Sequence, residues 1–213
     1  MKLMINEIYH SIQGESSYSG RPCIFIRLTY CNLRCSYCDS EHTFYEGEEL
    51  TIEEILEKIK EYPCNLVEVT GGEPLFQKNC IILLQKLVEN KYEVLLETSG
   101  SLSIESVPKE VINIIDFKCP SSKMVKKNLW ENINYLKKDD EIKFVIADKE
   151  DYVWAKNKIS EYELTKKSNI LMSPAYNEIE SKKIVDWILR DNLNVRFQIQ
   201  LHKEIWDPDK KGV

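Results

Sequence analysis

The sequence CIFIRLTYCNLRCSYC, residues 23–38, joins an apolar run to three closely spaced cysteines. The run from Cys23 to Thr29 is short and rich in β-branched and aromatic residues, which predicts a buried strand. Cys31, Cys35 and Cys38 follow it directly. We therefore expect all three thiols in one loop, at the carboxyl end of the first main strand.

Apolar runs of strand length recur along the chain and alternate with helix-like segments. We predict further strands near 65–70, 92–97, 111–117, 141–147, 168–173 and 194–201, and helices near 51–61, 79–90, 126–136, 149–161 and 179–191. Thr51 and Glu54 have the spacing of a capping box at the start of the first helix. The alternation is typical of a mostly parallel sheet with right-handed crossovers.

The length of the chain limits how far such a sheet can close. The 213 residues fall short of the roughly 250 of a closed eight-stranded barrel. We predict an α/β fold, a partial (incomplete) TIM-like β/α barrel with about six parallel strands, in a single domain of residues 1–213. Ligands of such folds bind at the carboxyl ends of the strands.

Composition narrows the class of protein. Hydrophobic residues make up 43% of the chain and charged residues 30%, and the net charge is −6. This balance is typical of a soluble globular protein, and the acidic charge disfavours a nucleic-acid partner. No apolar stretch is long enough to span a membrane, and the first residues do not resemble a signal peptide, so we expect a cytoplasmic protein with no membrane partner.

The seven cysteines are an odd number for a disulfide framework. Cys23, Cys64, Cys80 and Cys119 are scattered and are expected to be small buried hydrophobic residues. Cys31, Cys35 and Cys38 instead supply three thiolates to one centre, where a 4Fe–4S cluster or a structural zinc ion usually takes four ligands. Either one position stays open for a ligand, or His42, the nearest candidate, completes a zinc site; Asp39 is adjacent to Cys38.

The C-x3-C-x2-C spacing, with Tyr37 before the last cysteine, resembles the radical S-adenosylmethionine (radical SAM) superfamily. The resemblance implies a 4Fe–4S cluster whose open iron is chelated by the methionyl amine and carboxylate of SAM, and one-electron cleavage of SAM to a 5′-deoxyadenosyl radical. The segment 70–74, Thr-Gly-Gly-Glu-Pro, resembles the part of that superfamily that binds the methionine amine. The SAM contacts that follow from the resemblance are Tyr37, Cys38, Asp39, Gly72, Glu73, Ser99, Asp116 and Lys118.

Several shorter stretches narrow the resemblance further. They are residues 11–16 (Ser-Ile-Gln-Gly-Glu-Ser), Arg27, the run from Cys38 to Ser40, and Gln200 to Lys203 with Trp206. Together they resemble the 7-carboxy-7-deazaguanine synthase family, carbon–nitrogen lyases of 7-deazapurine (queuosine) biosynthesis. That family converts 6-carboxy-5,6,7,8-tetrahydropterin to 7-carboxy-7-deazaguanine with loss of ammonia, and magnesium supports the reaction.

The same resemblance implies roles for individual residues and partners. Arg27 is expected to pair with the substrate carboxylate, to which a planar guanidinium is well suited, and Ser40 to give its hydroxyl oxygen to magnesium. A homodimer and an electron donor such as flavodoxin or ferredoxin are also implied. The substrate contacts that follow are Ile12, Gln13, Gly14, Glu15, Arg27 and Thr70.

Other interpretations remain open at this point. A glycyl-radical-enzyme activating enzyme shares the cysteine spacing but acts on a protein, and the stretch Gln13 to Glu15 favours the pterin substrate. A non-enzymatic zinc-binding module is the second alternative. Arg27 could form an ordinary ion pair and Ser40 could be a plain loop hydroxyl, while His202 is interpreted as packing against the last strand.

Overall fold

The structure is a computed structural model that describes residues 1–208 and 210–213. Its centre is one nine-stranded sheet in the order β3-β1-β2-β4-β5-β6-β7-β8-β9. The strands are β1 (Lys2–Ile12), β2 (Pro22–Leu28), β3 (Glu48–Thr51), β4 (Leu66–Gly71), β5 (Glu93–Thr98), β6 (Ile112–Asp116), β7 (Glu141–Ile146), β8 (Asn169–Pro174) and β9 (Arg196–Phe197). The strands from β2 onward in that order are parallel, while β1 is antiparallel to both β2 and β3.

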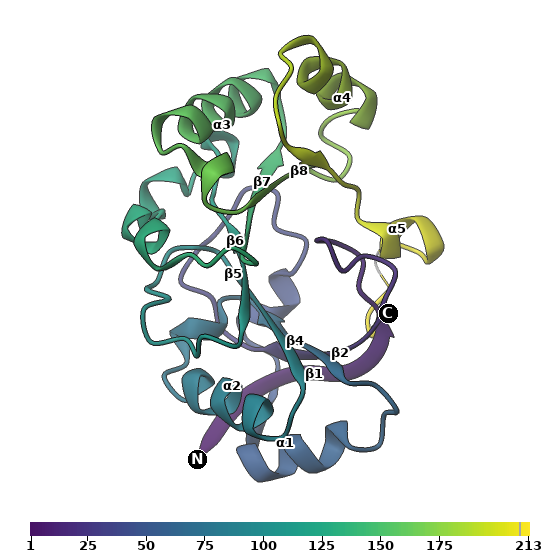
Figure 1. The fold of residues 1–213 in the computed structure, drawn as a ribbon. Helices are drawn as coiled ribbons and strands as arrows, with labels where there is room; N and C mark the ends of the chain where they lie inside the picture. Colours follow the sequence, from purple (N-terminus) through teal and green to yellow (C-terminus); the bar gives the residue numbers. More distant parts are fainter. Residues whose placement is uncertain (209) are drawn as a thin grey trace.

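The sheet curves without closing, because β3 and β9 are its two edges. The helices are α1 (Ile52–Ile59), α2 (Cys80–Glu89), α3 (Lys149–Glu161), α4 (Ser181–Arg190) and α5 (Leu201–Ile205). Helices α1 to α4 cover the outer side of the sheet, while α5 and the C-terminus lie across the opening on the other side (Figure 1). This arrangement confirms the predicted partial barrel.

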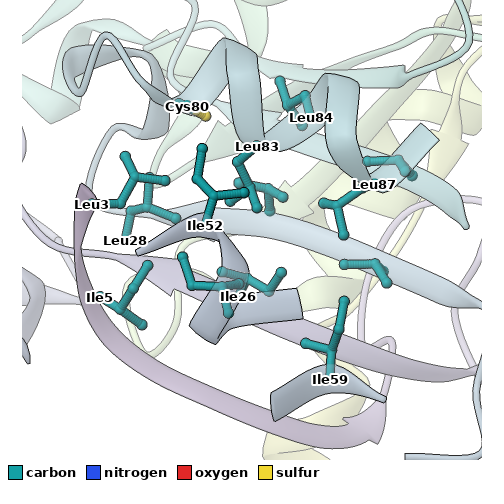
Figure 2. Close-up of a cluster of buried hydrophobic side chains, with 14 of the residues drawn as sticks. Leu3, Ile5, Ile26, Leu28, Ile52, Ile59, Cys80, Leu83, Leu84 and Leu87 are labelled. Carbon is teal, nitrogen blue, oxygen red and sulfur yellow. The ribbon is translucent and has the colours of Figure 1, made fainter. Parts of the chain in front are cut away.

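Two clusters of buried side chains fix the helices to the sheet. Figure 2 shows the first, in which Ile26 and Leu28 of β2 pack against Ile52 and Ile59 of α1 and against the leucines of α2. The second lies between β6–β8 and helices α3 and α4. Because full burial of one such side chain contributes roughly 1.5–3 kcal/mol, these clusters hold the strands rigidly beneath the loops at their carboxyl ends.

Most of the predicted elements agree with the structure, but two do not. The predicted helix 126–136 is two separate 3-10 turns, Val125–Lys127 and Trp130–Tyr135. The Asn128 side chain explains the break, because it bonds both the N–H and the C=O of Lys118 and leaves its own backbone extended. The predicted strand 194–201 shrinks to Arg196–Phe197, and α5 follows. Strands β1 and β3 were not predicted.

The cysteines outside the cluster loop are mostly as expected. Cys23, Cys80 and Cys119 are buried, whereas Cys64 is only half-buried and bonds the carbonyl of Pro22. None of the helices in the described ranges is long and apolar enough to cross a membrane.

The predicted capping box at α1 is present and gives a stability test. Thr51 Oγ1 accepts from the N–H of Glu54, and the Glu54 carboxylate accepts from the N–H of Thr51. Loss of an N-cap side chain costs about 1 kcal/mol. We expect Thr51→Ala to lower the free energy of unfolding by that amount in urea denaturation followed by circular dichroism, and Thr51→Ser to leave it near wild type. An unchanged midpoint for Thr51→Ala would contradict the assignment.

Candidate active site

A cavity of about 640 Å³ opens at the carboxyl ends of the parallel strands. The parallel strands β2, β4, β5, β6, β7 and β8 each contribute wall residues near their ends, among them Arg27 of β2, Thr70 of β4, Asp116 of β6 and Pro174 of β8. The cavity brings together all but one of the site residues expected from the sequence. These are Ile12, Gln13, Gly14, Glu15, Arg27, Cys31, Cys35, Tyr37, Cys38, Asp39, Ser40, Thr70, Gly72, Ser99, Asp116 and Lys118.

The three cysteines of the loop after β2 line this cavity and are half-buried. The loop is anchored from outside, because Ser36 donates from its N–H to the carbonyl of Ser122 and from its hydroxyl to the carbonyl of Ser121, at 3.1 and 2.6 Å. Burial raises the pKa of all three thiols, that of Cys35 to about 11, and Lys118 opposes the effect. Deprotonation therefore requires further positive charge beside the sulfurs.

An iron–sulfur cluster supplies that charge, and the donor set fits it. Cysteine thiolates are the ligands of such clusters, and a bound metal deprotonates its thiols outright. The zinc alternative fits less well. Among the residues that the structure describes, no three His, Cys, Asp or Glu side chains form a group that could hold a single metal ion. His42 lies beside Glu7, with 4.0 Å between Nε2 and Oε1.

The two glycines after β4 allow the chain to pass directly under the cysteine loop. Gly71 has φ +146°, and a Cβ on Gly72 would lie 2.3 Å from the carbonyl oxygen of Tyr30 and 2.8 Å from Cβ of Cys31. The N–H of Glu73 donates to that same carbonyl at 2.9 Å. Glycine at position 72 is therefore required for the position of the loop, in addition to any contact that it makes with a ligand.

Glu73 differs from its expected role as a ligand contact. Its carboxylate is fully buried and is not part of the cavity wall. It accepts from the N–H of Ser99 at 2.8 Å, from Thr98 Oγ1 at 2.9 Å and from the N–H of Leu75 at 3.0 Å. The side chain thus ties the end of β5 to the turn after β4.

The proposed SAM side of the cavity holds Asp116 and Lys118. Lys118 Nζ lies 2.9 Å from Asp116 Oδ2. Asp116 Oδ1 is buried and accepts no hydrogen bond from the described residues. Because buried acceptors are almost always paired, this oxygen fits a donor group of a bound ligand, as the amine or a ribose hydroxyl of SAM would supply.

Arg27 lines the cavity from β2 and already has two partners. Its Nε is 2.7 Å from Glu7 Oε1, and its Nη2 donates to the Tyr9 hydroxyl at 2.9 Å. The guanidinium is therefore held in a fixed orientation by β1 while it still lines the cavity. The sequence left two roles open for Arg27, an ordinary ion pair and a contact with the substrate. The ion pair is present, and the residue also lines the cavity.

Helix α5 connects the loop after β1 to the cysteine loop. Gln200 Nε2 donates to Glu15 Oε1 at 3.0 Å and to Asp39 Oδ2 at 3.1 Å, and Lys203 Nζ lies 2.8 Å from the same Asp39 oxygen. Burial acts to raise the pKa of Asp39, but Lys203 and Gln200 outweigh it and hold that pKa well below its usual range. Ser40 donates from Oγ to Asp39 Oδ1 at 3.0 Å.

Gly14 and His202 show how closely α5 packs. A Cβ on Gly14 would lie 2.3 Å from His202 Nδ1, and the N–H of Leu201 donates to the Gly14 carbonyl at 2.9 Å. His202 was expected to pack against the last strand; it lies instead on α5, where it packs against Gly14 and lines the cavity. Helix α5 was not predicted from the sequence, because residues 194–201 were expected to form one strand and only Arg196–Phe197 do so.

Some charged wall residues were not assigned a role from the sequence, chiefly Lys143, Glu97 and Glu68. Lys143 is 5% exposed and Glu68 is 3% exposed. Gln13 donates from Nε2 to Glu68, which orders the loop after β1. One feature of the sequence could have indicated these residues, namely a charged side chain inside an apolar strand, as in Ile142-Lys143-Phe144. A buried charge requires a partner or a ligand.

The open β/α barrel and the cavity with its three cysteines define a protein of the radical SAM class, and a model of the radical SAM superfamily matches residues 25–118. A 7-carboxy-7-deazaguanine synthase from Koribacter versatilis is 43% identical over 99% of this chain and all of the relative. One from Chlorobaculum tepidum is 42% identical over 99% of this chain and 97% of the relative. The chain belongs to the 7-carboxy-7-deazaguanine synthase family.

A solved structure supports the fold independently. The crystal structure of QueE from Escherichia coli matches with a TM-score of 0.76 at 23% identity, and the match covers 95% of each chain. At that identity the likeness shows the fold, and it confirms the incomplete barrel.

The contact between Gly72 and the cysteine loop can be tested by substitution. We expect Gly72→Ala to displace the loop, since its Cβ would overlap the Tyr30 carbonyl. The purified protein should bind less than half the iron of wild type when reconstituted anaerobically. Ser103→Ala, outside the cavity lining, is the control. Full iron content in Gly72→Ala would contradict the proposed role of the close approach.

Proposed function

We propose that this chain is a radical SAM lyase that converts 6-carboxy-5,6,7,8-tetrahydropterin to 7-carboxy-7-deazaguanine, with loss of ammonia, in 7-deazapurine (queuosine) biosynthesis. The observation that carries the proposal is one cavity that joins the three cluster cysteines to Arg27 and to the loop at Gln13. Full-length identity to relatives named for this reaction supports it. The continuous sheet supports a single domain of residues 1–213.

The proposed cofactors are a 4Fe–4S cluster held by Cys31, Cys35 and Cys38, and SAM. When bound, they supply a one-electron cleavage that produces an adenosyl radical to remove hydrogen from the substrate. Four residues that line the same cavity as the cysteines are proposed SAM contacts, namely Tyr37, Asp39, Gly72 and Ser99. Asp116 and Lys118 complete that side, with the unpaired Asp116 oxygen as the proposed acceptor.

The proposed substrate side of the cavity contains Arg27, the end of β1 with the loop after it, and Thr70 at the end of β4. Arg27 binds the substrate carboxylate, and Glu7 and Tyr9 keep its guanidinium oriented. Ile12, Gln13, Gly14, Glu15 and Thr70 surround the pterin ring. Fixed orientation lowers the entropy lost when the substrate is positioned.

Magnesium, an electron donor and a second copy of the chain complete the proposal. Ser40 lines the cavity and offers its hydroxyl oxygen, the kind of donor that magnesium accepts together with water. Flavodoxin or ferredoxin is the proposed reductant, and the protein is proposed to act as a homodimer.

The proposed reaction is tested directly with reconstituted protein. Anaerobic protein with about four irons per chain, the number in a cuboidal cluster, should form 7-carboxy-7-deazaguanine from the carboxytetrahydropterin, SAM, magnesium and a reductant. The product is followed by its absorbance and mass. Cys35→Ala should lose both iron and turnover, whereas Cys64→Ala, on a half-buried thiol outside the cavity, should keep them. A wild-type protein with a full cluster and no deazaguanine product would refute the proposal.

The role of Arg27 gives a second prediction. Hydrogen bonds to charged groups contribute about 1.5–3 kcal/mol, so we expect Arg27→Gln to raise the KM for the carboxytetrahydropterin by roughly tenfold to a hundredfold. Arg21→Gln is a matched control, because Arg21 forms a two-pronged ion pair with Glu93 outside the cavity lining. An unchanged KM for Arg27→Gln would show that another group binds the carboxylate.

A further inference from the structure

One buried ammonium group lies between the two ligand sides of the cavity. Lys143 is on β7, in register with Asp116 on β6 and with Leu171 on β8. Its Nζ lies 2.9 Å from Glu15 Oε2 and 3.7 Å from Asp116 Oδ2, and it also pairs with Glu97. The three carboxylates come from three different segments, namely the loop after β1 and the ends of β5 and β6.

The carboxylates around Lys143 have few other positively charged partners. Glu15 is otherwise bonded by the amides of Gln198 and Gln200, and Glu97 by the hydroxyl of Thr70. Glu68 adds a fourth carboxyl group, which is buried, and among the described residues Lys118 pairs with Asp116 alone. Within the part of the chain that the structure describes, Lys143 is therefore the cation that contacts both Glu15 and Glu97.

The ammonium of Lys143 acts to lower the pKa of two of these carboxyl groups, Glu15 and Glu68, against the effect of burial. Burial alone would raise the pKa of Glu15, but Lys143 and the hydrogen bond from Gln200 together hold that pKa below its ordinary value. Burial and the charges of Glu97 and Glu15 raise the pKa of Glu68 well above its ordinary value, and Lys143 opposes them. Carboxylates this close repel each other, so without the ammonium they would move apart or bind protons.

We propose that Lys143 is a positioning residue that holds Glu15, on the substrate side, and Asp116, on the SAM side, in their working positions through one shared cation. The inference rests on the proposed function, because that function assigns the two sides. It predicts that a change at Lys143 alters binding of both ligands, whereas a change at Glu15 alters that of the pterin alone. Glu97 lies between them and is held by the same ammonium.

Substitution of Lys143 tests this with two ligands in the same protein. We expect Lys143→Met in the cluster-loaded protein to weaken SAM binding and to raise the KM for the pterin, each by about tenfold or more. The acidic limb of its kcat/KM profile should move to higher pH by roughly one to three units. Lys143→Gln carries the same expectation if the Met variant does not fold, and Lys143→Arg, which keeps the charge, should keep the wild-type limb.

A double-mutant cycle with Glu15→Gln separates positioning from general destabilisation. If Lys143 acts through Glu15, the loss of kcat/KM in the double variant should be smaller than the product of the two single losses. Lys156→Met is the matched control, since Lys156 pairs with Asp191 at 2.8 Å and does not line the cavity. It should retain wild-type binding, turnover and pH profile.

The outcomes distinguish this inference from the proposed function. If the wild-type protein forms no deazaguanine, the proposed function is refuted. SAM affinity and the pH dependence of reductive SAM cleavage then still test the role of Lys143. Wild-type SAM affinity and an unmoved acidic limb in the neutral variants would overturn the positioning role. So would independent, multiplicative losses in the cycle with Glu15.

Discussion

The arrangement of the site depends on the close approach of the glycine turn after β4 to the cysteine loop after β2. Tyr30 and Cys31 can lie where they do because Gly72 has no side chain, and the N–H of Glu73 then fixes the Tyr30 carbonyl. Parallel pairing of β2 with β4 brings the two turns to the same edge of the sheet. The three thiols therefore face the cavity half-buried, where burial raises their pKa and a bound metal cluster would favour their deprotonated form.

Charge compensation organises the remainder of the cavity. Carboxylates from β1, β4, β5, β6 and the cysteine loop face a space that also holds Arg27, Lys118, Lys143 and Lys203. Each of these cations pairs with at least one carboxylate before any ligand binds. Because removing one partner of a buried pair is strongly destabilising, the wall is held in place in advance of ligand binding. A preorganised wall suits a reaction in which a reactive radical must meet one hydrogen atom of the substrate.

The sequence predicts the parallel strands and the cysteine loop well, because buried strands have long apolar runs and the cysteine spacing is distinctive. It does not predict β1, whose polar residues include Asn6, Glu7 and His10 and whose pairing with β2 has a register shift between Ile5 and Glu7. It also does not predict the contacts of Glu73 and His202, since these are made with distant segments. Lys143 was inside a predicted strand, but only the folded sheet shows which carboxylates surround it.

We propose above all that the three cysteines hold a cluster with one iron open to SAM in this cavity. Electron paramagnetic resonance of the reduced, reconstituted protein tests it most directly, because the spectrum of a reduced cluster depends on the ligands of its irons. The account predicts about four irons per chain, the cuboidal stoichiometry, and a spectrum that changes when SAM is added. A colourless protein that binds zinc, or a cluster whose spectrum is the same with and without SAM, would contradict it.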